Sequence, residues 1–202
     1  LGFNVFGIRE ISKNPFTQNI KNYVNNIVAL RSIFAILSYI IYFSIIIFID
    51  KSTEVKLVLL ITGFNLFSYA VMLDWVFIGL EKMEIQAIRQ LITGILNLVG
   101  IFLFVNDKSD TILTAAIFSA ATAINSAWIL LYYLKIYKNF RFEKNFILWK
   151  TILKSSLPIG LTNLCVILYS SFSILILGFF RTYYETGVYD AGFRFYSLTM
   201  MP

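Results

Sequence analysis

Five long runs of apolar residues, separated by short charged connections, constrain this 202-residue chain more than any other feature. The runs cover residues 28–49, 57–80, 85–105, 111–134 and 152–180, and a sixth begins near Gly187. A helix needs about 20 residues, rising about 1.5 Å each, to cross a hydrocarbon core. With 58% hydrophobic and 14% charged residues, the chain has more apolar surface than a soluble domain buries. The sequence therefore predicts an all-α integral membrane protein, a multi-span helical bundle.

Lysine and arginine are distributed unevenly between alternate connections. The connections and helix ends of one side, where Arg31 can snorkel, hold 12 of these residues, and those of the other side hold 4. Six of the 12 lie between Lys135 and Gly160: Lys135, Lys138, Arg141, Lys144, Lys150 and Lys154. By the positive-inside rule, this basic stretch is cytoplasmic. The net charge of +6 therefore indicates orientation and contact with anionic lipid headgroups, and no nucleic-acid partner is expected.

The basic stretch is predicted to join two helical lobes. Beyond it, Pro158 removes a backbone donor and is expected to kink or break the fifth run near its cytoplasmic end, and Gly160 makes the break easier. The alternative is that Pro158 lies in the first turns of the helix, where proline is tolerated. Pro158 and Gly160 are therefore the hinge candidates. The chain begins at Leu1 and ends at Pro202 within an apolar run, so we expect an internal piece of a longer protein.

One asparagine lies well inside each run from the second to the fifth: Asn65, Asn97, Asn125 and Asn163. Small or polar residues share a helix face with most of them. One interpretation is helix packing, because small residues let helices approach and amides bond between them. The other is a hydrated cavity whose side chains bind a polar cargo such as a sugar. Both interpretations remain open at the level of the sequence.

Two further candidates are charged residues inside the runs. Asp74 is an intramembrane carboxylate, which is costly unless paired or hydrated, and in a continuous helix it lies on the face opposite Asn65. The alternative is an interfacial aspartate that meets a basic loop residue. In the sixth run, Asp190 and Arg194 are four residues apart and can pair on one helix face. Alternatively, Arg194 faces an anionic cargo.

The residue types weigh against an enzyme. The chain has no histidine, and Cys165, its single cysteine, lies in an apolar run, which leaves no disulfide framework and no cysteine-based metal site. The sequence has no P-loop, no dinucleotide glycine fingerprint and no zinc-protease motif. We therefore expect no catalytic residue, no metal and no cofactor.

Four segments together carry a family resemblance. They are LGFNVFGIREISKNP at 1–15, DWVFIGLEKME at 74–84, LKSSLPIGLTN at 153–163 and LGFFRTYYETGVYDAGFRF at 177–195. The chain resembles the polysaccharide transporter branch of the multidrug, oligosaccharidyl-lipid and polysaccharide exporter superfamily, and is most similar to bacterial O-antigen or capsule repeat-unit flippases. The resemblance implies twelve or more transmembrane helices in two lobes of six. Residues 1–134 then hold the end of helix two and helices three to six, 135–151 the cytoplasmic linker, and 152–202 helix seven and the start of helix eight.

The resemblance also implies a function. Such proteins lie in the bacterial plasma (inner) membrane and flip undecaprenyl-diphosphate-linked oligosaccharides by alternating access, coupled to an ion gradient, with cationic cavity residues receiving the diphosphate and sugar. The expected partners are the lipid-linked oligosaccharide, membrane lipids, and the polysaccharide polymerase and chain-length machinery. Many relatives carry an aspartate near the position of Ser173. This chain has a serine there, so no ion-coupling role is assigned to that position. The alternatives are a drug/cation antiporter of the same fold and a membrane-embedded repeat-unit polymerase, against which the short outer connections weigh.

Overall fold

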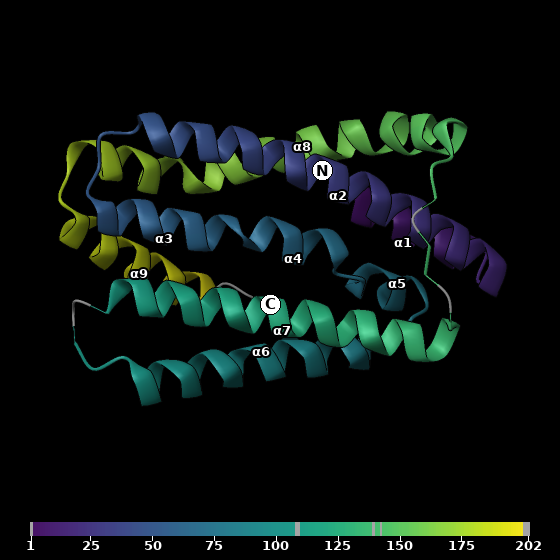
Figure 1. The fold of residues 1–202 in the computed structure, drawn as a ribbon. Helices are drawn as coiled ribbons and strands as arrows, with labels where there is room; N and C mark the ends of the chain where they lie inside the picture. The colour runs from purple at the N-terminus through teal and green to yellow at the C-terminus, as the bar shows by residue number, and fades with distance from the viewer. Residues whose placement is uncertain (1, 108–109, 139, 142, 200–202) are drawn as a thin grey trace. The chain divides into compact units, whose positions relative to one another are not determined.

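The computed structural model describes residues 2–107, 110–138, 140–141 and 143–199 (Figure 1). Within these ranges the regular structure is α-helical and contains no strand. Five helices are long and apolar enough to span a membrane, which confirms the predicted multi-span helical fold. The chain divides into two compact units, one of residues 3–155 and one of residues 1–2 and 156–202, and each unit is described by itself.

The first unit is built from consecutive helices joined by short connections. Its helices are α1 (Phe3–Lys13), α2 (Thr17–Phe48), α3 (Thr53–Gly63), α4 (Asn65–Val71), α5 (Asp74–Gly79), α6 (Met83–Phe104), α7 (Thr111–Tyr137) and the first ten residues of α8 (Phe146–Phe180). Helix α4 packs against both α2 and α7, and α6 packs against α7 (Figure 1). The α5–α6 and α7–α8 connections lie at one end of the unit, and the α2–α3 and α6–α7 connections lie at the other.

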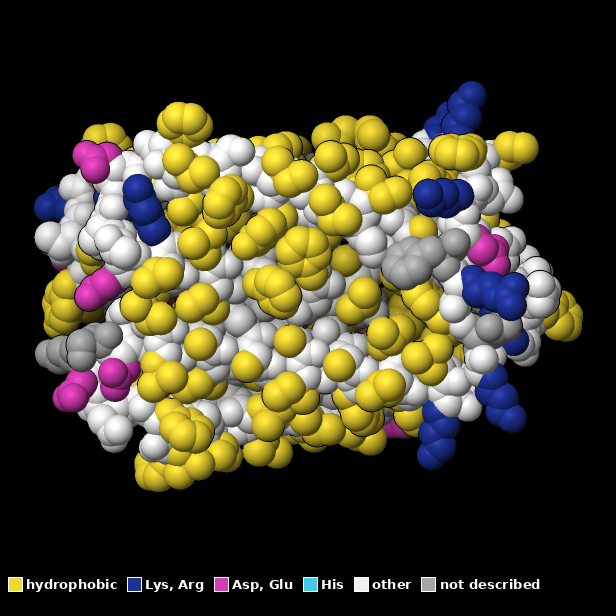
Figure 2. Space-filling model, viewed as in Figure 1, with side chains coloured by type: hydrophobic (Ala, Val, Ile, Leu, Met, Phe, Trp, Pro, Cys, Tyr) yellow, Lys and Arg dark blue, Asp and Glu magenta, His cyan; other side chains and the backbone are white. Residues whose placement is uncertain are grey.

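The alternation of charge follows this arrangement. Figure 2 shows apolar side chains over the faces of the long helices and a concentration of lysine and arginine at the end where α7 passes into α8. Antiparallel neighbours place every second connection on the same side of a bilayer, so the lysine and arginine bias and the helix order agree.

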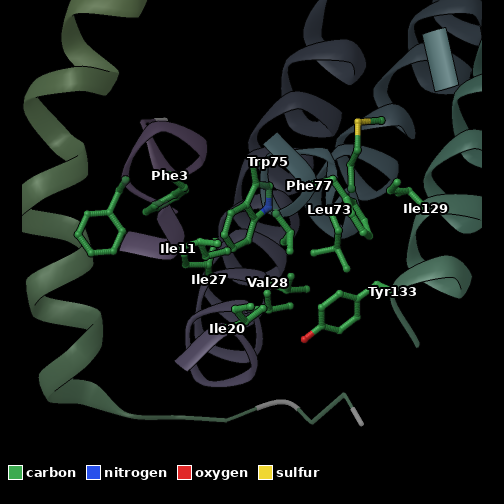
Figure 3. Packing of buried hydrophobic residues seen from close by; sticks show 14 of the residues in the cluster. Phe3, Ile11, Ile20, Ile27, Val28, Leu73, Trp75, Phe77, Ile129 and Tyr133 are labelled. Carbon is green, nitrogen blue, oxygen red and sulfur yellow. The ribbon is translucent and has the colours of Figure 1, made fainter. Parts of the chain in front are cut away.

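Residues 3–27 lie before the first predicted apolar run and are almost wholly helical. The reason is a helical repeat of apolar residues between the polar ones: Ile20, Val24 and Ile27 face one side of α2 and are 1% exposed or less. Together with Phe3 and Ile11 of α1 and Trp75 of α5, they belong to one buried cluster (Figure 3). The helices at the start of the chain therefore belong to the core of the first unit.

The second predicted span is interrupted, which the sequence did not predict. It consists of α3, α4 and α5, and the chain turns sharply at Met72 and Leu73, where Met72 adopts an extended backbone with φ −68° and ψ 124°. No proline lies at this point. Because the helical phase is lost there, the prediction that Asp74 shares one continuous helix with Asn65, on its opposite face, is wrong.

Helix α8 differs from its prediction in where it begins and how it continues. It starts at Phe146, six residues before the expected 152, and is helical through Pro158. The expected break at Pro158 is therefore not found, and neither is the alternative of a helix start, since Pro158 lies about three turns inside. The role of Pro158 and Gly160 as hinges stays a prediction.

In the second unit, α8 is followed by α9 (Tyr183–Thr199), which begins four residues before the expected Gly187. A capping box fixes the start of α9: the Thr182 backbone N–H donates to Glu185 Oε2 at 3.1 Å, and the Glu185 N–H donates to Thr182 Oγ1 at 3.3 Å. The donors on Thr182 hold the pKa of Glu185 below its ordinary value. The sequence signal T-x-x-E at 182–185 is present and was missed.

Candidate functional site

Three charged side chains from three helices come together where the second span is interrupted. Arg31 comes from α2, Asp74 from the start of α5, and Arg89 from α6. We call these three residues the charged cluster. Two guanidinium groups and one carboxylate give it a formal charge of +1 in the interior of an apolar bundle. Such groups are costly inside a membrane unless they are paired or functional.

The guanidinium group of Arg31 donates hydrogen bonds to backbone carbonyls at the interruption of the second span. Its Nη1 donates to the carbonyl oxygen of Met72 at 3.0 Å, and its Nη2 donates to the carbonyl oxygen of Tyr69. A turn in a membrane helix leaves carbonyl groups without their regular partners, and these must be satisfied inside the protein. Arg31 was expected to snorkel towards the headgroups. Its side chain points instead across to the second span.

Asp74 and Arg89 form a loose ion pair. Arg89 Nη2 lies 3.8 Å from Asp74 Oδ2, and the two side chains are 12% and 15% exposed, respectively. Arg89 Nη1 contacts Met72 Sδ at 3.6 Å, while Arg89 Nε and Asp74 Oδ1 have no hydrogen-bond partner among the described residues. The partner of Asp74 is therefore an arginine within the third span. The alternative that Asp74 meets a basic loop residue is wrong.

Two of the predicted asparagines connect neighbouring helices. Asn65 Nδ2 donates to Ser119 Oγ of α7 at 3.2 Å, and Ser119 Oγ donates to the Ile61 carbonyl at 3.3 Å. Asn125 Nδ2 donates to Thr93 Oγ1 of α6. These contacts support the helix-packing interpretation for Asn65 and Asn125.

Some buried hydrogen-bond acceptors in this region have no partner in the described structure. The side-chain oxygens of Asn65, Asn97 and Asn125 are buried and have no hydrogen-bond partner within the ranges that the structure describes. An amide oxygen without a partner is an acceptor that a hydroxyl-rich ligand can use. The cavity interpretation therefore stays a prediction for these three residues.

The other two candidates lie in the second unit. Asn163 and Arg194 are both exposed there. Arg194 Nε donates to Asp190 Oδ2 at 2.9 Å, so the predicted pairing along one face of α9 is confirmed. Whether either residue meets a cargo stays a prediction. Among the described residues, no group of three or more Cys, Asp or Glu side chains is placed to hold a metal ion.

The contact between α6 and α7 gives a first testable prediction. We expect Thr93→Val and Asn125→Leu to show a coupling energy of about 0.6 kcal/mol in a double-mutant cycle, because hydrogen bonds between membrane helices are worth about that much on average. Reversible unfolding of the four proteins in detergent micelles measures it. Fully additive effects would show that the Thr93–Asn125 contact does not hold α6 to α7.

Sequence reasoning found Asp74 but not its two partners. Arg31 was counted with the helix ends, and Arg89, near the start of the third apolar run, was not singled out. The available signal was that three charged residues, Arg31, Asp74 and Arg89, lie at similar distances from the predicted cytoplasmic ends of three successive spans. Helices of an antiparallel bundle bring such positions to one level of the membrane.

Comparison with known proteins agrees with this architecture. A sequence model of a family described as polysaccharide biosynthesis protein matches residues 1–202. No curated protein and no solved structure gave a significant match. The five apolar helices and the family match together indicate a multi-pass membrane protein with a role in polysaccharide biosynthesis. The chain belongs to the polysaccharide biosynthesis protein family.

Proposed function

We propose that this chain contributes to a transporter that flips undecaprenyl-diphosphate-linked oligosaccharide repeat units across the bacterial plasma membrane by alternating access. The observation that carries the proposal is a charged cluster with net positive charge inside the helical bundle of a polysaccharide biosynthesis family member. A lipid-linked oligosaccharide is anionic at its diphosphate and polar along its sugars. A protein that moves it needs buried cationic and amide groups.

Within the charged cluster, Arg89 is the residue best placed to meet a phosphate group. Arg31 already donates to two backbone carbonyls, whereas Arg89 has a buried Nε without a partner in the described part of the chain and a loose contact with Asp74. A guanidinium with unused donors binds phosphate oxygens in a bidentate manner, which a lysine does not do. In this proposal, Arg89 receives the diphosphate and the amides of Asn65, Asn97 and Asn125 face the sugars.

The proposal is one of transport without covalent chemistry. The connections between the helices of the first unit are short, the longest being residues 138–145, so the first unit carries no soluble catalytic domain between its helices. The flipped repeat unit would then pass to a polymerase and chain-length machinery in the outer leaflet.

The test is deletion of the full-length gene in its host. We expect undecaprenyl-linked repeat units to accumulate in the cytoplasmic leaflet, with loss of surface polysaccharide and restoration by the wild-type gene on a plasmid. Lipid extraction and mass spectrometry, together with surface staining, measure both effects. Normal surface polysaccharide in the deletion strain would contradict the proposal, and increased sensitivity to cationic drugs with normal polysaccharide would instead indicate a drug/cation antiporter.

A further inference from the structure

The basic connection between α7 and α8 is attached to α2 by side-chain hydrogen bonds. Its described residues, which include Lys138, Arg141 and Asn145, are not helical. Two adjacent asparagines of α2, Asn25 and Asn26, are 5% and 0% exposed and reach this connection from the helix. We call these two residues the asparagine latch, and the described residues of the connection, 138, 140–141 and 143–145, the strap.

Asn25 holds the middle of the strap. Its Oδ1 accepts a hydrogen bond from the backbone N–H of Arg141 at 3.1 Å, and its Nδ2 donates to Glu143 Oε1 at 3.0 Å. The acceptor oxygen and the donor nitrogen of one buried amide thus both bond to a segment more than a hundred residues away in the sequence. A buried amide stabilises the fold most where its donor and acceptor are both paired, because a buried group without a hydrogen bond lowers stability.

Asn26 holds the end of the strap and the start of α8. Its Oδ1 accepts from the Asn145 backbone N–H at 3.1 Å and from Trp149 Nε1 at 2.9 Å. Its Nδ2 donates to the carbonyl oxygen and to Oδ1 of Asn22, one turn earlier on α2, at 2.9 and 3.0 Å. Asn145 Oδ1 in turn accepts the Leu148 N–H at 3.1 Å and so caps α8.

Apolar packing continues the attachment along α8. Ile152 is fully buried in the core cluster of the first unit, and Leu148, Trp149 and Leu153 pack against that cluster. The division between the two compact units falls directly after this segment, between Ser155 and Ser156, inside one continuous helix. Three residues into α8 from Ser155, Pro158 lacks the N–H that would bond the carbonyl of Lys154.

We propose that the strap is a fixed part of the first unit, locked onto α2 by the asparagine latch, and that the freedom of the chain to bend begins only within α8, beyond Ser155. The basic connection is then not a flexible linker. Its cations are presented at constant positions at the membrane surface, and any rearrangement of α8 is carried by the helix itself, next to Pro158. This inference concerns a conformational device and does not depend on the cargo.

Hydrogen exchange of the full-length protein in lipid nanodiscs tests the latch. In the wild type, we expect slow exchange of the Arg141 and Asn145 backbone amides, which donate to the latch. In the Asn25→Ala/Asn26→Ala variant, we expect exchange there to be about tenfold faster, with little change in α6, because local opening no longer breaks these hydrogen bonds. Asn19→Ala, on the same helix but outside these contacts, is the matched control. Equal exchange in the strap of both variants and the wild type would overturn the proposal.

A milder variant keeps the test valid if the double variant does not fold. Trp149→Phe keeps an aromatic ring but removes the Nε1 donor, and Asn26→Asp keeps the accepting oxygen but removes the donor to Asn22. We expect faster strap exchange in Trp149→Phe, by a few-fold, and near wild-type protection of the Asn145 amide in Asn26→Asp. Protection lost in Asn26→Asp but kept in Trp149→Phe would contradict the assigned hydrogen bonds.

Distance measurements test where the bending begins. In a Cys165→Ser background, spin labels at Gln18→Cys and Lys144→Cys report on the strap against α2, and labels at Lys144→Cys and Leu168→Cys report across the division within α8. All three labelled residues are exposed in the structure. We expect one narrow distance for the first pair in every transport state and a distance that changes for the second pair. A first pair that changes with state while the second stays constant would reverse the assignment.

Discussion

Arg89→Gln is expected to lower the free energy of unfolding by about 3 kcal/mol, because it leaves the largely buried carboxylate of Asp74 without its cationic partner. Asp74→Asn is expected to be destabilising for the converse reason, since two guanidinium groups then share the charged cluster without a negative charge. Unfolding in mixed micelles, monitored by tryptophan fluorescence and circular dichroism, measures both effects.

The double variant Asp74→Asn/Arg89→Gln separates pairing from other roles. We expect it to be more stable than the Arg89→Gln variant, because neutral amides of similar shape do not carry the desolvation penalty of an unpaired charge. Asp190→Asn is the control, since it breaks an ion pair whose arginine side chain is 77% exposed, and its effect should stay below about 1 kcal/mol. Strictly additive losses in the double variant would show that the 3.8 Å contact does not couple the two residues.

Transport measurements on the same variants distinguish a structural pair from a cargo site. If Arg89 meets the diphosphate, the double variant regains stability but fails to restore surface polysaccharide in the deletion strain. If the pair is only structural, transport returns together with stability. The second result would remove Arg89 from the proposed site and leave the assignment of the family intact.

Gly7→Ala is expected to destabilise the protein by about 1–3 kcal/mol, because α1 passes so close to α5 that a Cβ at this position would overlap the Trp75 ring. Trp75 is fully buried within the core cluster (Figure 3), so a shift of the ring would displace the side chains packed around it. Thermal unfolding in detergent micelles measures the change.

Gly94→Ala provides the matched control for this prediction. Gly94 lies in α6, and a Cβ there would meet no heavy atom within 4 Å, so alanine should be neutral or stabilise the helix by up to about 1 kcal/mol. The smaller ring of Trp75→Phe should recover part of the loss in a Gly7→Ala background. Equal effects at Gly7 and Gly94 would mean that the close approach of α1 and α5 does not exist in solution.

The number and order of the spanning helices were predictable because they depend on length and hydropathy, which are local properties. The long apolar runs had to become helices, and the lysine and arginine bias fixed the alternation of their ends. The ends of these helices were harder to predict from the sequence. Phe146 begins α8 because Asn145 caps it and Trp149 bonds to α2, and neither contact raises the hydropathy of residues 146–151.

The charged cluster and the asparagine latch were not predictable from local pattern because distant segments create them. The turn at Met72 has no proline or glycine to mark it, and it is stabilised by Arg31, 41 residues earlier. In the same way, Asn25 and Asn26 look like loop residues in sequence, yet they are buried because the strap returns to them after more than a hundred residues. From the sequence alone, polar residues in such positions are predicted to be exposed, because their hydrogen-bond partners are not known.

The dependence of the turn at Met72 on Arg31 also has a consequence for how the protein is made. A newly inserted second span, alone in lipid, would expose the carbonyls of Tyr69 and Met72 to hydrocarbon, so it is expected to enter the bilayer as a straight helix. It can bend only after α2 lies beside it and supplies the guanidinium. We therefore expect α2 to act during biogenesis as an intramolecular template for the shape of the second span.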